Sequence, residues 1–221
     1  MAELSLDIAI YLAITTVCAG MLFYIGFRKV IASTLCPIGN YLVLCGISEL
    51  AGKIMANLGV GNAVIVPFYS AMEFIILFYF FYVSILNKTI NKFFLVIGFI
   101  GVTLVFIDYF YFADNADINV HTKLVINVLV IGGVVFSFFQ SFSRDQPLEK
   151  YMSIALSGIL IMFSGSAFIF FMRGFIVGFE IDTQFWIYTA SALTNFIGYL
   201  LMTWALYISS KYYKRRLIIK K

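Results

Sequence analysis

Glu49, Lys53, Glu73 and Asn195 are the residues of this sequence best suited to chemistry, because each interrupts a long apolar run. A charged or amide group inside such a run is costly unless it is paired, hydrogen-bonded or hydrated. Tyr69 precedes Glu73 by one helical turn, so that its hydroxyl group can donate a hydrogen bond to the carboxylate. We expect these residues to line a pathway for a ligand or an ion.

Glu49 and Lys53 are four residues apart with the acid first, the order that favours an ion pair on one helix face. One interpretation is that the two groups neutralise each other and fix their helix in the fold. The other interpretation places both in a hydrated cavity that opens outside the cell, with Lys53 nearer the mouth.

Glu73 has no cation in its own run, since no Lys or Arg occurs between Gly61 and Lys88. Its carboxyl group must therefore be protonated, hydrogen-bonded, or paired across helices with Lys53. The sequence leaves these three alternatives open.

Asp108 and Arg173 lie near the outer ends of the fourth and sixth apolar runs. They are either simple interfacial residues or a pair that closes the outer face of the protein. His121 is the sole histidine, which excludes a multi-histidine metal site. The cysteines have no metal-ligand spacing and are expected to be small packing residues: Cys18, Cys36 and Cys45. We expect no catalytic residues, no metal, no cofactor and no enzyme activity.

The composition places these residues in a membrane protein. Hydrophobic residues make up 62% of the 221-residue chain and charged residues 12%, against about 45–50% and about 25% in soluble domains. A soluble fold of this size needs a polar exterior and could not cover so much apolar surface. The apolar runs are continuous rather than alternating, which excludes a transmembrane barrel and indicates an all-α fold.

Seven of these runs reach the length of about 20 residues that a membrane-spanning helix needs. We expect one polytopic seven-helix transmembrane bundle over residues 1–210, followed by a basic tail at 211–221. The expected spans are 6–27, 37–58, 63–86, 93–112, 120–142, 151–179 and 185–209.

Basic residues distinguish the two sides of the membrane. They follow the first, third, fifth and seventh spans, whereas the opposite side is mostly acidic, with Lys123 and Arg173 close to its boundary. Cytoplasmic loops are the basic ones. We therefore expect a multi-pass protein of the plasma (inner) membrane, with the N-terminus outside and the C-terminus in the cytoplasm. Since no basic residue precedes Arg28, we expect no cleavable signal peptide.

The net charge of +4 does not indicate nucleic-acid binding, because six of the fifteen basic residues fall in the last eleven positions. Such a tail is typical of contact with anionic lipid headgroups. Docking of a partner protein is the second interpretation.

Seven helices with an outside N-terminus invite comparison with retinal proteins and G-protein-coupled receptors. The last span has no lysine for a retinal Schiff base, and the receptor motifs are absent: the third span ends Val83-Ser84-Ile85-Leu86, and the seventh has no proline. Topology alone carries little information about function.

One segment, from Ser48 to Tyr82, has a more distinctive pattern. It reads Ser48-Glu49-Leu50, then Asn62, then Pro67-Phe68-Tyr69, and then Met72-Glu73-Phe74 followed by aromatic residues. This resembles a group of bacterial seven-span membrane proteins with an acidic residue in the second span and Tyr-x-x-x-Glu-Phe in the third. The group has no established activity, so the resemblance implies a location and two positions, Glu49 and Glu73.

The leading hypothesis is a receptor-like or sensory protein that acts through a partner protein, because the short loops leave no room for an output domain. Its ligand would be a small molecule. The first alternative is a small transporter or channel in which Glu73 carries a proton or binds a cation. The second alternative is a structural subunit of a larger membrane complex.

Overall fold

The computed structural model describes residues 2–59, 65–85, 88–112, 120–143 and 148–219. These ranges contain helices and no strand, which confirms the all-α prediction. The α-helices are α1 (Ala2–Phe27), α2 (Cys36–Asn57), α3 (Ile65–Ser84), α4 (Lys88–Ile107), α5 (Val120–Ser143), α6 (Lys150–Ile176) and α7 (Ile181–Ile219).

Short irregular turns join or extend some helices. Two 3₁₀ turns, η1 (Arg28–Val30) and η2 (Ser33–Leu35), connect α1 to α2, and a π-helical turn, η3 (Asp108–Phe112), continues α4. Gly59 follows α2 with a φ of 68°, a left-handed conformation that glycine adopts without steric cost and that commonly ends a helix.

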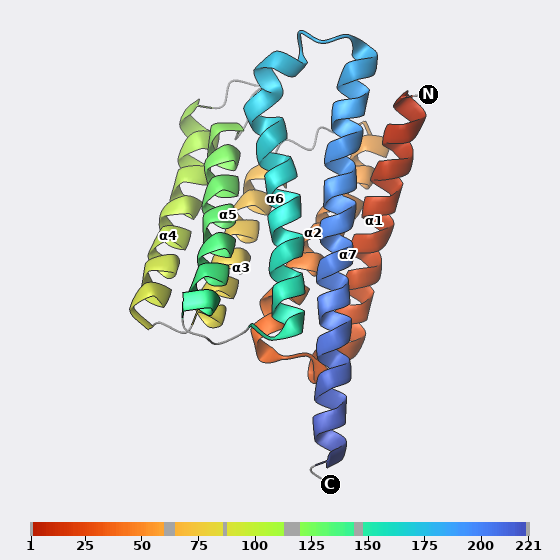
Figure 1. Cartoon of the computed structure of the whole chain (residues 1–221). Helices are drawn as coiled ribbons and strands as arrows, with labels where there is room; N and C mark the ends of the chain where they lie inside the picture. The colour runs from red at the N-terminus through yellow and green to blue at the C-terminus, as the bar shows by residue number, and fades with distance from the viewer. Residues whose placement is uncertain (1, 60–64, 86–87, 113–119, 144–147, 220–221) are drawn as a thin grey trace.

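Seven helices of the described chain are long and apolar enough to cross a membrane. They run in alternating directions as one bundle (Figure 1). α7 packs between α1 and α6, α2 packs on α1 and α3, and α3 also contacts α4 and α5. The N-terminus lies at one end of the bundle and the C-terminus at the other (Figure 1).

The outside of the bundle is apolar. Phe99 is 77% exposed and Phe142 is 80% exposed, and many other large hydrophobic side chains also point outward. A water-soluble protein rarely presents so much continuous apolar surface, whereas lipid favours it. The outward side chains thus agree with a multi-pass membrane protein.

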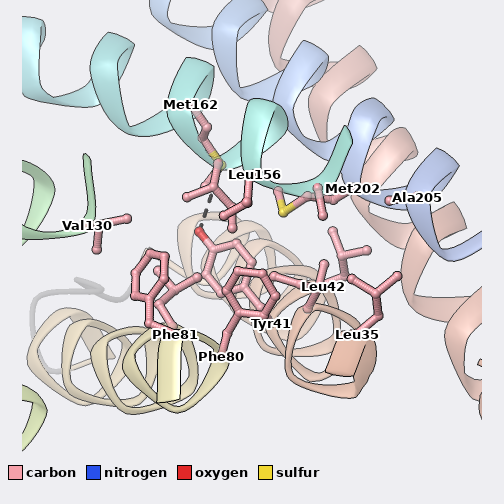
Figure 2. Packing of buried hydrophobic residues seen from close by; sticks show 14 of the residues in the cluster. Leu35, Tyr41, Leu42, Phe80, Phe81, Val130, Leu156, Met162, Met202 and Ala205 are labelled. Atoms are coloured by element: carbon pink, nitrogen blue, oxygen red, sulfur yellow. Dashed lines mark hydrogen bonds between the residues drawn. The ribbon is translucent and has the colours of Figure 1, made fainter. Parts of the chain in front are cut away.

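The interior is packed around Tyr41 of α2, which is 1% exposed. Figure 2 shows Phe80 and Phe81 of α3 beside it, and its hydroxyl group directed at Met162 of α6. Packing of side chains from different helices is a main source of association in lipid, where burial of apolar surface provides little drive. This cluster holds the middle of the bundle together beside the site described below.

Small residues bring α6 and α7 into close contact. A Cβ atom added to Gly158 would lie 2.8 Å from the carbonyl oxygen of Gly198, and one added to Gly198 would lie 2.9 Å from that of Gly158. Gly165 of α6 packs closely against the side chain of Thr194 of α7. The glycines Gly158, Gly165 and Gly198 therefore form packing surfaces between these two helices.

α7 is longer than the span 185–209 that hydropathy predicts. It has 39 residues and a length of about 58 Å at 1.5 Å per residue, nearly twice the hydrocarbon thickness of about 30 Å. No glycine or proline follows Gly198 to end it, and lysine and arginine are good helix formers. The region expected to be a tail is thus helical up to Ile219, and it projects beyond the other helices (Figure 1).

Candidate functional site

A cavity of about 300 Å³ lies between helices at the N-terminal end of the bundle. The helices α2, α3, α5, α6 and α7 line it, and it extends from Glu73 out to Gly52 and Ile65, near the end of α2 and the start of α3. The lining residues are Tyr41, Cys45, Ser48, Glu49, Gly52, Ile65, Val66, Tyr69, Glu73, Lys123, Met162, Phe163, Ser166, Asn195 and Tyr199.

Glu73 lies at the inner end of this cavity, with its side chain 4% exposed. Tyr41 and Tyr69 donate hydrogen bonds of 3.0 and 3.1 Å to its Oε1. The ammonium group of Lys123 pairs with its Oε2. The carboxylate therefore has a donor on each oxygen and is both hydrogen-bonded and paired, which offsets its loss of hydration.

Lys123 is the fourth residue of α5, where a lysine side chain ordinarily extends outward to water. Here it turns inward: its side chain is 14% exposed, and its Nζ lies 5.2 Å from the ring centroid of Tyr69. The carboxylate of Glu73 and the face of that ring both favour a cation at this point. Among the described residues, Glu73 and Lys123 form the one ion pair within 4 Å.

A second polar group lies one turn further along α5. Asn127 is fully buried and donates a 3.0 Å hydrogen bond from Nδ2 to Oγ of Ser166, a cavity residue of α6. Its Oδ1 has no partner among the described residues. α5 thus directs Lys123 and Asn127 from one face toward the cavity wall.

Glu49 lines the cavity from α2, but Lys53 does not. The Nζ of Lys53 lies 5.3 Å from the ring centroid of Tyr11 on α1, and its side chain is exposed. Lys53 thus pairs with neither Glu49 nor Glu73, two pairings that the sequence left open as alternatives. Four residues advance a helix by about 400°, so Lys53 is rotated about 40° from Glu49, toward α1.

The remaining predicted residues divide into those in the cavity and those outside it. Tyr69 and Asn195 line the cavity with Glu49 and Glu73. Asp108, in the π-helical turn, accepts a 2.6 Å hydrogen bond from Thr122 of α5. The side chain of Arg173 is outside the described part of the chain, and so is that of His121.

Sequence reasoning does not identify Tyr41, Lys123 and Asn127 as site residues. The position of Lys123 in its apolar run places the residue at the membrane boundary. It does not show whether the long side chain points outward to water or inward to the other helices. The sequence nevertheless contains a pattern that could have identified Lys123 and Asn127. Asn127 is a polar residue in an apolar run and follows Lys123 by four positions. That spacing places both on one helix face.

The arrangement can bind a small molecule by hydrogen bonds, charge and aromatic contact. The cavity contains two carboxyl groups and one ammonium group, together with serine, asparagine and tyrosine side chains. Among the described residues, no group of three or more His, Cys, Asp or Glu side chains is placed to hold a metal ion.

No protein-family model, no curated protein and no solved structure matches this chain.

Proposed function

We propose that this chain is a receptor-like or sensory membrane protein that binds a small molecule in the cavity and acts through a partner protein. The observation that carries the proposal is the cavity itself, about 300 Å³ in volume, with the Glu73–Lys123 pair at its inner end. Small-molecule sites are typically clefts of about 300–1,000 Å³ with apolar walls and a few polar groups that fix the ligand.

The geometry also supports a route from the ligand to a partner. α7 lines the cavity with Asn195 and Tyr199 and then continues to Ile219, about 30 Å further along its axis. A ligand that prefers one packing of the helices around the cavity shifts the protein toward that packing. The projecting end of α7 then presents the change to a partner. The short loops between the helices leave no room for a signalling domain there.

We further propose that the protein lies in a bacterial inner membrane with its N-terminus outside. The Lys and Arg residues of the loops support this orientation, and the Tyr69-x-x-x-Glu73-Phe74 pattern supports a bacterial source. In this orientation the cavity faces the outside and the projecting end of α7, with its basic residues, faces the cytoplasm. We infer a receptor-like role from the cavity and its charged residues, because the number of helices alone says little about function.

The proposal is tested by purifying the tagged protein from its host in a gentle detergent and identifying bound small molecules and partner proteins by native mass spectrometry. Gly52→Trp fills the cavity without a backbone clash, since an added Cβ meets nothing within 4 Å. Gly132→Trp is the matched control, because Gly132 has equal space and lies outside the cavity.

We expect wild type and Gly132→Trp to carry the same small molecule and a stoichiometric partner, and Gly52→Trp to lose the small molecule. Equal occupancy in all three proteins would show that the molecule binds elsewhere. A folded protein that carries no small molecule and no partner in any of these forms would contradict the proposal.

One observation favours a second candidate function, a transporter coupled to protons or cations. Glu49 and Glu73 place two carboxyl groups in one cavity together with the ammonium group of Lys123, which pairs with Glu73. Ionisable residues inside the membrane often mark proton or ion pathways. Flux into liposomes that is present for wild type and absent for a folded Glu73→Gln variant would support transport, and equal flux would exclude Glu73 as the carrier.

A further inference from the structure

Glu49 is the charged group of the cavity for which the described residues provide no partner. Its carboxylate has no cation within 4 Å and no hydrogen-bond donor among the described side chains and backbone groups. Its side chain projects from α2 into the cavity, one and two turns beyond Cys45 and Tyr41 on the same wall. A carboxylate within a membrane-spanning helix needs a counter-charge or water.

The other charges of the cavity cannot supply that counter-charge, because they already satisfy each other. Lys123 pairs with Glu73, and the two tyrosine hydroxyl groups also donate to Glu73. The described lining residues therefore contain two carboxyl groups and one ammonium group, and Glu49 is the carboxyl group without a counter-charge.

Lys53 does not balance it either. Although Lys53 is one turn from Glu49, its Nζ lies against the ring of Tyr11 on α1, outside the cavity. Among the described side chains, therefore, none supplies a counter-charge to Glu49, and a cation from solution or from the lipid can take that place.

The cavity wall also suits a cation with an apolar body. The rings of Tyr41, Tyr69, Phe163 and Tyr199 contribute to it. One of them, Tyr69, already has an ammonium group 5.2 Å from its centroid. Aromatic faces attract cations, and organic ammonium ions are commonly recognised by such rings together with a carboxylate.

We propose that the ligand of this cavity is a small organic cation, a protonated amine or a quaternary ammonium compound. Its charge pairs with Glu49, and its apolar part packs on the aromatic wall formed by Tyr69, Phe163 and Tyr199. This inference rests on the proposed function, namely that the cavity is a ligand site, and adds the chemical class of the ligand. The same chemistry is available from a soluble amine and from an ethanolamine lipid headgroup.

The test measures stabilisation of the purified protein against heat by three matched series of small molecules. The series are aryl-alkyl amines such as phenethylamine, the alcohols of the same shape such as 2-phenylethanol, and the carboxylates such as 3-phenylpropanoate. Each is tested on wild type, Glu49→Gln, Gly52→Trp and Glu180→Gln. Glu180→Gln is the charge-matched control, because Glu180 is exposed and outside the cavity. Ligand binding to the folded state raises its stability.

We expect amines alone to stabilise wild type and Glu180→Gln. Binding should weaken at least about tenfold in Glu49→Gln, because the charge pair between the amine and the carboxylate is lost. It should disappear in Gly52→Trp. Lys53→Met should leave amine binding unchanged. Repeating the titration in nanodiscs of phosphatidylglycerol, with and without phosphatidylethanolamine, distinguishes the sources: competition by the ethanolamine lipid identifies a headgroup ligand, and its absence identifies a soluble amine.

Alcohols or carboxylates that bind as well as amines, or amine binding that survives Glu49→Gln, would overturn the inference. If such binding still disappears in Gly52→Trp, the proposed ligand site itself remains. If no member of the three series distinguishes wild type from Gly52→Trp, the inference is overturned, and the ligand site is then decided by the small molecules that native mass spectrometry finds on wild type and not on Gly52→Trp.

Discussion

Glu73 of α3 and Lys123 of α5 are fifty positions apart in the chain and form an ion pair inside the bundle, with side chains 4% and 14% exposed. Both helices begin at the end of the bundle where the N-terminus lies (Figure 1). Removing two charges from water is expensive, and the pair is tolerated only while both partners and their hydrogen bonds are present.

Each single substitution of the pair should destabilise the protein more than the double substitution does. Glu73→Gln strands the ammonium group of Lys123, and Lys123→Met strands the carboxylate of Glu73; each should cost about 3–5 kcal/mol. The double variant leaves no unpaired charge and should recover part of this loss. The measurement is a double-mutant cycle on thermal unfolding in detergent.

The matched control is the same cycle with Lys53→Met in place of Lys123→Met. Because Lys53 lies against Tyr11 and not near Glu73, the effects of Lys53→Met and Glu73→Gln should be additive. Additive effects in the Lys123 cycle, or strong coupling in the Lys53 cycle, would contradict the pairing described above.

The two tyrosines that donate to Glu73 should differ in importance. Tyr41→Phe and Tyr69→Phe each remove one hydrogen bond to a charged group, which is worth about 1–3 kcal/mol. The larger loss is expected for Tyr41, which is 1% exposed, because water cannot replace its hydroxyl group. Tyr69 is only half-buried, so water in the cavity can partly replace it.

Thermal unfolding again provides the measurement, with Tyr79→Phe as the control. Tyr79 is 49% exposed on the outside of α3, so its substitution should leave the midpoint of unfolding unchanged. A larger loss for Tyr79→Phe than for Tyr41→Phe would mean that the buried hydroxyl group contributes little.

The helices could be predicted from the sequence because lipid imposes a simple requirement, a continuous apolar run of sufficient length. The run 37–58 corresponds to α2, for example, and its polar interruption at Glu49 does lie on the cavity. The end of α7 could not be predicted in this way, since a helix that leaves the membrane no longer needs apolar residues, and α7 continues to Ile219.

The partner of Glu73 could not be predicted either. The spacing of residues in the sequence indicates which of them share a face of one helix. It does not indicate which face of a neighbouring helix lies opposite that face. Lys53 has a suitable depth and Lys123 does not, yet the long side chain of Lys123 turns into the bundle and reaches Oε2 of Glu73. Contacts between helices are set by how the helices rotate against each other, and this depends on packing across the entire core.

The crossing of α6 and α7 should be intolerant of even one added methyl group. A Cβ atom on Gly158 would lie 2.8 Å from a backbone oxygen of α7, and backbone atoms cannot move aside as side chains do. Gly158→Ala and Gly198→Ala should each destabilise the protein by about 1–3 kcal/mol. Thermal unfolding provides the measurement.

Gly132→Ala is the control for this pair, because an added Cβ meets nothing within 4 Å there. It should be neutral or stabilise the protein by up to about 1 kcal/mol, since alanine is the better helix former. If Gly158→Ala is as well tolerated as Gly132→Ala, the two helices do not touch at this crossing.

We expect the cavity to open on the outer side of the membrane, the side on which α7 begins. In a variant without Cys18, Cys36 and Cys45, a cysteine at Asp182 should react with a membrane-impermeant maleimide in intact cells. A cysteine at Lys211 should react only after the membrane is permeabilised, because basic segments remain in the cytoplasm. Both native side chains are exposed, at opposite ends of α7, so lack of access to a buried site does not confound the comparison.

The same labelling locates the mouth of the cavity. Ser48→Cys, which lines the cavity, should react with a small cationic thiol reagent from the side on which Asp182→Cys reacts, and Gly52→Trp should block the reaction. A reversed pattern at both ends of α7 would place the mouth in the cytoplasm, and the ligand would then be an intracellular one. Labelling of Ser48→Cys that is unaffected by Gly52→Trp would mean that the reagent enters by another path, between helices rather than past the end of α2.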